Sequence, residues 1–153
     1  MSRIEKLVCL GLVAGCVIAP TVALADNCTG HWSNTTVSTD TLEIEKNYTL
    51  TFFHARGNST SENSVHTGVG MCGGYALTTP DGKTYLAGIC TRQGKDGGWS
   101  DAWSMQPGAQ RGEWHQVAGT GVYAKTAGIN KGWWEGTLGN GKTDMGNWGG
   151  DCK

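Results

Sequence analysis

Glu113 and His115 are the two side chains in this sequence whose types and spacing best fit acid–base chemistry. They stand two positions apart, so in a strand both project from one face while Trp114 projects from the other. A histidine titrates near neutral pH and burial raises the pKa of a glutamate, so the pair could move protons inside an enclosed interior. Tyr75 is a third polar candidate for such an interior. We favour the other placement, in which Glu113 and His115 are solvated on the outer face.

Seven tryptophans are the most unusual feature of the composition. Each has a large apolar surface and one N–H donor, which suits a core, a ligand pocket or carbohydrate stacking. We expect most of them in the core or at the rim of the fold. Adjacent Trp133 and Trp134 project from opposite faces of a strand, so one of them is a candidate for an outer contact surface. The candidates for binding a ligand are Trp103, Trp114, Trp133 and Trp134.

Four cysteines follow residue 25, and an even number in an exported chain predicts two disulfides, for which three pairings are open. Zinc is the alternative, but no two of these cysteines have the C-x₂₋₄-C spacing of a zinc site. The four histidines are isolated from one another, and we expect His54 and His66 at the surface. The sequence therefore predicts no metal site.

The segment at residues 79–83, Thr-Pro-Asp-Gly-Lys, has the chemistry of a type I turn closed by a glycine bulge. If the two ends of that segment pair, Cys72 faces Cys90 at a non-hydrogen-bonded position, where side chains approach most closely. This predicts a Cys72–Cys90 disulfide, and with it a Cys28–Cys152 disulfide that joins the two ends of the domain. A bulge at the two adjacent glycines would shift this register, so the other pairings stay open.

A second hairpin is predicted at Asn140-Gly141, the strongest two-residue turn signal in the chain. Pairing Gly139 with Lys142 places Trp133 opposite Trp148. Such a cross-strand pair of tryptophans contributes about 0.5–1.5 kcal/mol beyond its buried area.

Residues 42–54 alternate apolar and polar side chains, which predicts one long strand with one buried face. Leu42, Leu50 and Phe52 belong to the apolar series. Lys46 falls on the apolar side and is expected near a rim, with its amine reaching water. The polar residues 56–63 are expected to form a loop.

Glycines dominate the rest of the chain, and 23 of the 25 follow residue 25. They are scattered between short segments of aromatic and β-branched residues, and no stretch shows a helical period for three turns. This excludes collagen and predicts an all-β domain with many tight corners.

The first 25 residues have the layout of a secretory signal peptide: a charged start, an apolar run and Ala23-Leu24-Ala25 before polar residues. Residues 26–153 would then form one domain, with a net charge of about −2, in the periplasm or outside the cell. Lipidation at Cys16 is the alternative, because residues 13–16 resemble a lipobox. We expect no membrane span, and the acidic balance argues against nucleic acid as a partner.

The stretch Gly119-Thr120-Gly121-Val122-Tyr123-Ala124, followed by Gly132-Trp133-Trp134, resembles a pattern in bacterial exported proteins of the allene oxide cyclase and dirigent type of β-barrel. The resemblance covers about residues 112–150, and Lys125 stands where a glycine is common. It implies an antiparallel barrel of about eight strands, with a β-sandwich as the alternative. No family catalytic residue maps onto this chain. The same glycines match a dinucleotide fingerprint, but later glycines interrupt the helix that motif needs, so no cofactor is predicted.

Three functions follow as hypotheses. The first is an exported barrel that binds a small hydrophobic or aromatic molecule without transforming it. The second is a cyclase or isomerase that uses the barrel interior as a shaped container, as the resemblance implies. The third is a filled barrel that contacts protein or glycan through its surface. Fold alone does not choose between them, and the sequence does not settle whether the chain is an enzyme or which oligomer it forms.

Overall fold

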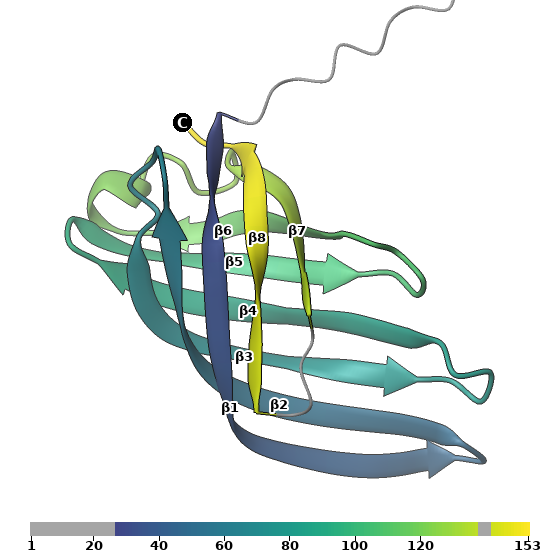
Figure 1. Cartoon of the computed structure of the whole chain (residues 1–153). Coiled ribbons are helices and arrows are strands. Elements are labelled where there is room, and N and C mark those ends of the chain that lie inside the picture. The colour runs from purple at the N-terminus through teal and green to yellow at the C-terminus, as the bar shows by residue number, and fades with distance from the viewer. Residues whose placement is uncertain (1–26, 138–141) are drawn as a thin grey trace, which may run out of the picture.

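The computed structural model describes residues 27–137 and 142–153 (Figure 1). The predicted signal peptide, Cys16 and the Asn140-Gly141 turn lie outside these residues. The described chain forms eight strands and one short 3-10 turn, η1 (Gly121–Tyr123), and it holds no helix long and apolar enough to cross a membrane. The strands are β1 (Cys28–Glu45), β2 (Tyr48–Ser61), β3 (Gly68–Thr78), β4 (Thr84–Gly94), β5 (Gly97–Met105), β6 (Gly112–Gly119), β7 (Lys131–Thr137) and β8 (Thr143–Asp151).

The strands form one antiparallel sheet in chain order, and β8 pairs back onto β1 to close it. This confirms the prediction of an all-β, eight-stranded barrel, and the sandwich alternative is wrong because the sheet is continuous. Figure 1 shows β7, β8 and the first part of β1 crossing in front of β3–β6. β1 bends at a register shift between Thr36 and Ser38, a bulge that lets one strand serve both parts of the barrel.

Both predicted disulfides are present. Cys28 bonds to Cys152, and Cys72 bonds to Cys90. The β3–β4 register is the predicted one, with Tyr75 opposite Ala87 and Cys72 opposite Cys90. The Cα atoms of Cys72 and Cys90 are 4.0 Å apart, the close approach of a non-hydrogen-bonded pair.

Residues 42–54 are not one strand. The chain turns at Lys46 and Asn47, where Asn47 adopts a left-handed φ of 67°, and β1 and β2 form a hairpin. Asparagine tolerates this conformation better than most residues. The alternation misled because it continues on both arms: Leu42 lies directly opposite Leu50, so the two share a face. The expected loop at 56–63 is also wrong up to Ser61, where β2 ends.

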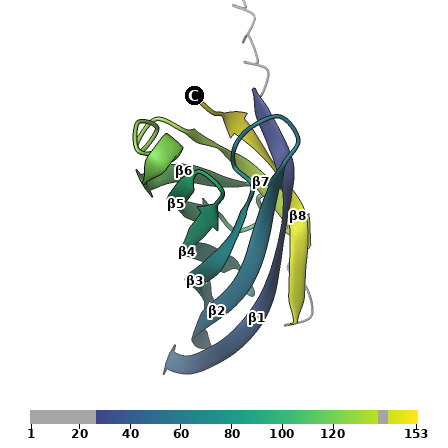
Figure 2. The same ribbon diagram turned by 90° about the vertical axis from the view of Figure 1, so that its left-hand side faces the viewer.

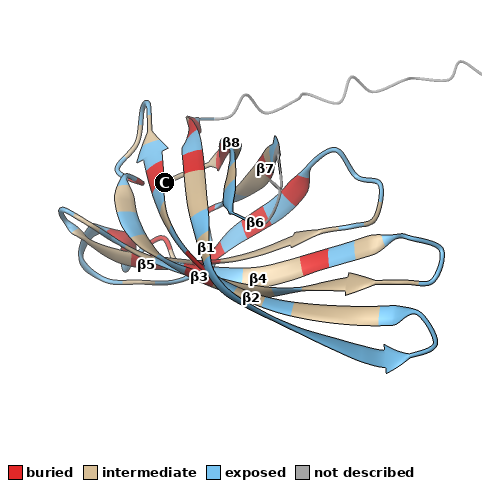
Figure 3. Cartoon of the chain, turned by 60° about the horizontal axis from the view of Figure 1, so that its bottom comes forward, coloured by how far each residue is buried: buried red, intermediate tan, exposed pale blue. Residues whose placement is uncertain are grey.

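The face that was expected to be buried points outward. Leu42 is 51% exposed and Phe52 is 41% exposed. Figure 3 shows no buried stretch along the far part of the β1–β2 hairpin, and Figure 2 shows this hairpin curving away past the end of β8.

The predicted register of β7 and β8 is wrong by one residue. Trp148 lies opposite Trp134 instead of Trp133, and Thr137 lies opposite Met145. The residue numbers of each pair of cross-strand partners therefore add to an even total. A hairpin closed by a two-residue turn would give an odd total. A one-residue shift exchanges the faces of a strand, so Trp134 is inside the barrel and Trp133 is outside.

Candidate functional site

The barrel encloses a partly open cavity of about 110 Å³, called here the indole pocket. Aromatic rings form most of its wall, and the Cys72–Cys90 disulfide forms one side. Polar groups reach it from both ends. The aromatic lining residues are Trp32, Phe53, Trp99, Trp103, Trp114, Trp134 and Trp148, and the polar ones are Asn34, Ser59, His66, Arg92, Asp101 and Asp144.

Three of the four tryptophans predicted to bind a ligand line this pocket: Trp103, Trp114 and Trp134. Trp133 lies on the outer face, where the Arg111 guanidinium sits 4.0 Å from its ring centroid. This agrees with the expectation that one member of the adjacent pair faces away from the interior.

Glycines on neighbouring strands make room for the indoles. A Cβ added at Gly112 would lie 2.2 Å from Trp134 Cε2, and one at Gly88 would lie 2.4 Å from Trp103 Cζ2. No side chain fits at such distances, so the rings lie directly on the backbone of the adjacent strand. The same holds for Gly30 beneath Trp148, and Gly136 and Gly68 make room for Trp32 and Trp99, which each lie two strands away.

The indoles contact one another edge to face. Trp134 packs perpendicular to Trp32 and Trp103, with ring centroids 6.0 and 5.8 Å apart. Trp114 and Trp148 pack in the same way at 5.9 Å. This geometry is the favourable one for aromatic pairs, and it holds the wall of the pocket rigid without filling its centre.

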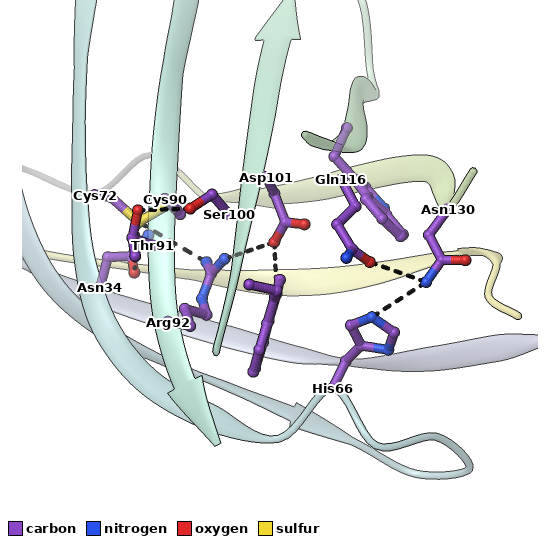
Figure 4. Close-up of polar contacts among 12 residues, drawn as sticks. Asn34, His66, Cys72, Cys90, Thr91, Arg92, Ser100, Asp101, Gln116 and Asn130 are labelled. Atoms are coloured by element: carbon purple, nitrogen blue, oxygen red, sulfur yellow. Dashed lines mark hydrogen bonds and ion pairs between the residues drawn. A yellow bond between two sulfur atoms is a disulfide. The ribbon is translucent and has the colours of Figure 1, made fainter. Parts of the chain in front are cut away.

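Arg92 and Asp101, which both line the indole pocket, form a buried ion pair (Figure 4). Arg92 Nη1 donates to Asp101 Oδ2 at 3.0 Å, and both side chains are almost fully enclosed. Trp99 Nε1 donates to the same carboxylate oxygen at 2.8 Å. Both side chains face the interior because each residue stands two positions after an inward-facing one: Arg92 follows Cys90, and Asp101 follows Trp99. Sequence reasoning missed both residues, although the inward Cys90 already fixed the face of Arg92.

Burial raises the pKa of Asp101 to about 6, and the neighbouring Arg92 charge offsets only part of this effect. Burial likewise lowers the pKa of the Arg92 guanidinium, against the attraction of Asp101. The carboxyl is therefore poised to change charge in mildly acidic solution, which is uncommon for an aspartate.

Asp101→Asn should become progressively more stable relative to the wild type as the pH rises. The folded state holds a proton on Asp101 up to about pH 6, whereas the unfolded chain releases it near the ordinary aspartate pKa of 3.8. Ionising Asp101 therefore costs the wild type roughly 3 kcal/mol between about pH 4 and pH 7, and the asparagine cannot ionise. Urea denaturation of both proteins across this range measures the difference. A difference that stays constant with pH would show that the Asp101 pKa is not raised.

Four polar atoms in the pocket wall are buried and have no hydrogen-bond partner: Asp101 Oδ1 and the indole Nε1 atoms of Trp103, Trp134 and Trp148. A buried donor or acceptor without a partner costs about 1–3 kcal/mol. All four atoms belong to residues that line the indole pocket, so a polar ligand or ordered water would satisfy them after a small side-chain movement that opens them to the cavity.

A polar network closes one end of the barrel. Gln116 Oε1 accepts from Thr126 Oγ1 at 3.0 Å and from Asn130 Nδ2 at 3.1 Å, and Asn130 Nδ2 also lies 3.4 Å from His66 Nε2. The hydroxyl of Tyr123, in η1, donates to the backbone oxygen of Val65. Figure 4 shows Gln116, Asn130 and His66 in a row beside the ion pair.

His66 is buried, so its expected surface position is wrong, while His54 is exposed as expected. The His66 ring packs against Trp99 and Tyr123, with centroids 5.5 and 5.2 Å away. Burial lowers the pKa of His66, so the imidazole is neutral at neutral pH. It forms the inner end of the pocket as an uncharged polar group.

The predicted acid–base candidates lie outside the barrel. Glu113 and His115 are exposed on the outer face of β6, the placement we favoured, and Tyr75 is 40% exposed on β3. Glu113 and His115 line a separate open pocket together with Trp133. None of the three candidates lines the indole pocket, where the acids and bases are Asp101, Asp144 and His66.

In the described part of the chain, no cluster of three His, Cys, Asp or Glu side chains could hold a metal ion. The polar groups that line the pocket are thus the indole donors, the Arg92–Asp101 pair, His66, Asp144, Asn34 and Ser59. Comparison of the chain with protein-family profiles, with curated proteins and with solved structures found no match.

Proposed function

We propose that this protein binds a small, single-ring aromatic molecule with a polar substituent in the indole pocket. The observation that carries the proposal is the set of unpartnered buried groups around the cavity: the carboxylate oxygen of Asp101 and three indole N–H donors. A core built only for stability would have apolar contacts at these positions, because each unpaired polar atom weakens the fold.

The size of the cavity limits the ligand. An apolar cavity of about 150 Å³ in another protein holds benzene, and larger pockets of about 300 Å³ and upward hold drug-sized molecules. At about 110 Å³, the indole pocket is suited to one aromatic ring. Edge-to-face indoles would contact both the rim and the face of such a ring.

The polar groups set the chemistry of the substituent. A hydroxyl group can donate to Asp101 Oδ1 and accept from an indole N–H, so a phenol satisfies both kinds of unpaired group. A simple hydrocarbon ring leaves all of them unpaired. The paired charges of Arg92 and Asp101 cancel, which favours a neutral ligand over a strongly charged one.

Phenol should bind at least tenfold more tightly than toluene, because a site built for a hydroxyl discriminates against the analogue that lacks it. Titration calorimetry at about pH 7 gives both affinities, with tryptophan fluorescence as a second signal. Asp101→Asn should remove most of the preference for phenol and leave toluene unchanged. Equal affinities of the wild type for the two compounds, or no binding of either compound, would contradict the proposal.

The cyclase or isomerase hypothesis remains a second proposal, supported by one observation. Asp101, with a pKa of about 6, is a carboxyl able to exchange a proton near neutral pH beside the cavity. A ligand recovered chemically changed after incubation, with Asp101→Asn inactive, would support catalysis. Recovery of the unchanged ligand would favour simple binding.

We also propose that the chain is exported, as the apolar leader and the two disulfides suggest. The likeness of residues 112–150 to allene oxide cyclase-type barrels points the same way. The intact mass of protein purified from cells distinguishes cleavage after Ala25 from a lipidated Cys16.

A further inference from the structure

One edge of the barrel sheet is open. β1 pairs with β8 only from Cys28 to Thr35, and one more backbone bond joins Thr36 N to Lys142 O at 3.0 Å. From Ser38 onward β1 pairs with β2 alone. No described residue pairs with the other side of this part of β1, called here the open edge (residues 38–45). Such an edge presents free N–H and C=O groups to solvent.

The outer face beside the open edge is apolar. Leu42 lies opposite Leu50, which lies opposite Leu77, which in turn lies opposite Tyr85, so one apolar row crosses four strands. Several large side chains along this face are about half exposed; they include Leu42, Ile44, Phe52, Tyr75 and Tyr85.

The inner face of the same hairpin is polar. The hydroxyl oxygens of Thr41 and Thr51 face each other at 3.1 Å. The usual arrangement of apolar residues inside and polar residues outside is thus reversed here. Contiguous exposed apolar surface of this kind marks contact sites in soluble proteins.

Acidic side chains line the open edge. Asp40, Glu43 and Glu45 are all exposed, and no described residue forms an ion pair with any of them. The only nearby base within the hairpin turn is Lys46. Two copies joined antiparallel through this edge would bring six carboxylates into one ribbon, since each copy contributes three. Charge therefore disfavours a second copy and favours a basic partner.

We propose that the open edge binds an extended segment of another protein, rich in lysine or arginine alternating with apolar residues, as an added β-strand. The backbone of that segment would satisfy the free groups of β1. Its apolar side chains would pack beside Leu42 and Ile44 on the outer face, and its basic side chains, on the opposite face, would reach Glu43 and Glu45. This surface lies outside the barrel, so the inference is independent of the indole pocket.

The test uses the full-length mature protein and a fluorescent peptide of about ten alternating lysine and valine residues, long enough to cover the edge. We expect saturable binding by fluorescence anisotropy. The triple variant D40K/E43K/E45K should weaken it at least tenfold. The control E62K/D96K/E113K makes the same change in charge at exposed sites away from the edge and should leave the affinity unchanged.

A peptide with every backbone nitrogen methylated keeps the charge and the side chains but has no N–H donor on either edge. It should not bind, whereas equal binding of both peptides would overturn strand addition. Hydrogen exchange of the wild type should show new protection within residues 38–45 and none within residues 28–35, which already pair with β8. These two measurements decide the question even if the triple variant fails to fold. A wild-type dimer that excludes the peptide would also overturn the proposal, because a second copy would then occupy the edge.

Discussion

Replacing Arg92 with methionine is expected to lower the free energy of unfolding by about 3–5 kcal/mol at neutral pH, the usual cost of breaking a buried ion pair by removing one partner. The substitution leaves an unbranched apolar side chain and removes the charge that faces Asp101 at 3.0 Å. Asp101 then keeps only the Trp99 N–H as donor, and its pKa rises above about 6, so part of the cost is the uptake of a proton. Urea denaturation followed by tryptophan fluorescence measures the loss.

Two variants make this result interpretable. Arg111→Met breaks the ion pair between Arg111 and Glu135, whose side chains are 54% and 35% exposed, and should cost no more than about 1 kcal/mol. The double variant R92M/D101L removes both buried charges and should recover most of the loss, because an apolar pair of similar volume replaces the ions. If R92M alone stayed within about 1 kcal/mol of the wild type, the pair would have to be solvated rather than buried.

Removing the Cys28–Cys152 disulfide by the double substitution C28A/C152A is expected to cost roughly 5 kcal/mol, the largest effect of any change to a covalent bond in the chain. The bond closes a loop with a sequence separation of 124. It also joins β1 to the end of β8, where the backbone pairing from Cys28 to Thr35 would remain as the link between the two strands. The loss is measured by chemical denaturation without reductant.

The matched variant is C72A/C90A, which opens a loop with a sequence separation of only 18. It should cost about 3 kcal/mol, because the entropy of closing a loop rises slowly with its length. The order of the two losses is the critical result. A larger loss for C72A/C90A would mean that the wall of the indole pocket, rather than chain closure, dominates the stability of the barrel.

Local turn chemistry explains what the sequence could predict. The Pro-Asp-Gly turn sets the register between β3 and β4, so Cys72 and Cys90 could be paired by counting along the two arms. The same counting failed between Trp133 and Trp148, because an assumed two-residue turn imposes an odd total on the paired numbers. Counting residues from a turn therefore predicts the strand register only where the number of residues in the turn is known.

Long-range features were harder to predict. The alternation of residues 42–54 runs unbroken through a turn, since Leu42 and Leu50 occupy the same face of two strands. Arg92 stands in a polar-looking segment, and nothing local indicates that closing β8 onto β1 will bury it. The sequence around His66 is typical of a surface loop, but Trp99 of β5 and Asn130, just before β7, pack against it.

The edge-to-face tryptophans have an optical consequence. Indole rings within about 6 Å of one another couple their electronic transitions, and Trp134 is this close to both Trp32 and Trp103. The far-ultraviolet circular dichroism of this protein should therefore contain paired bands of opposite sign from the aromatic rings, superimposed on the signal of the strands. Trp134→Leu should remove the contribution of its two pairs and leave that of Trp114 and Trp148 while the sheet persists. If the aromatic contribution is not subtracted, the spectrum will give too low a strand content for a barrel that consists mostly of strands.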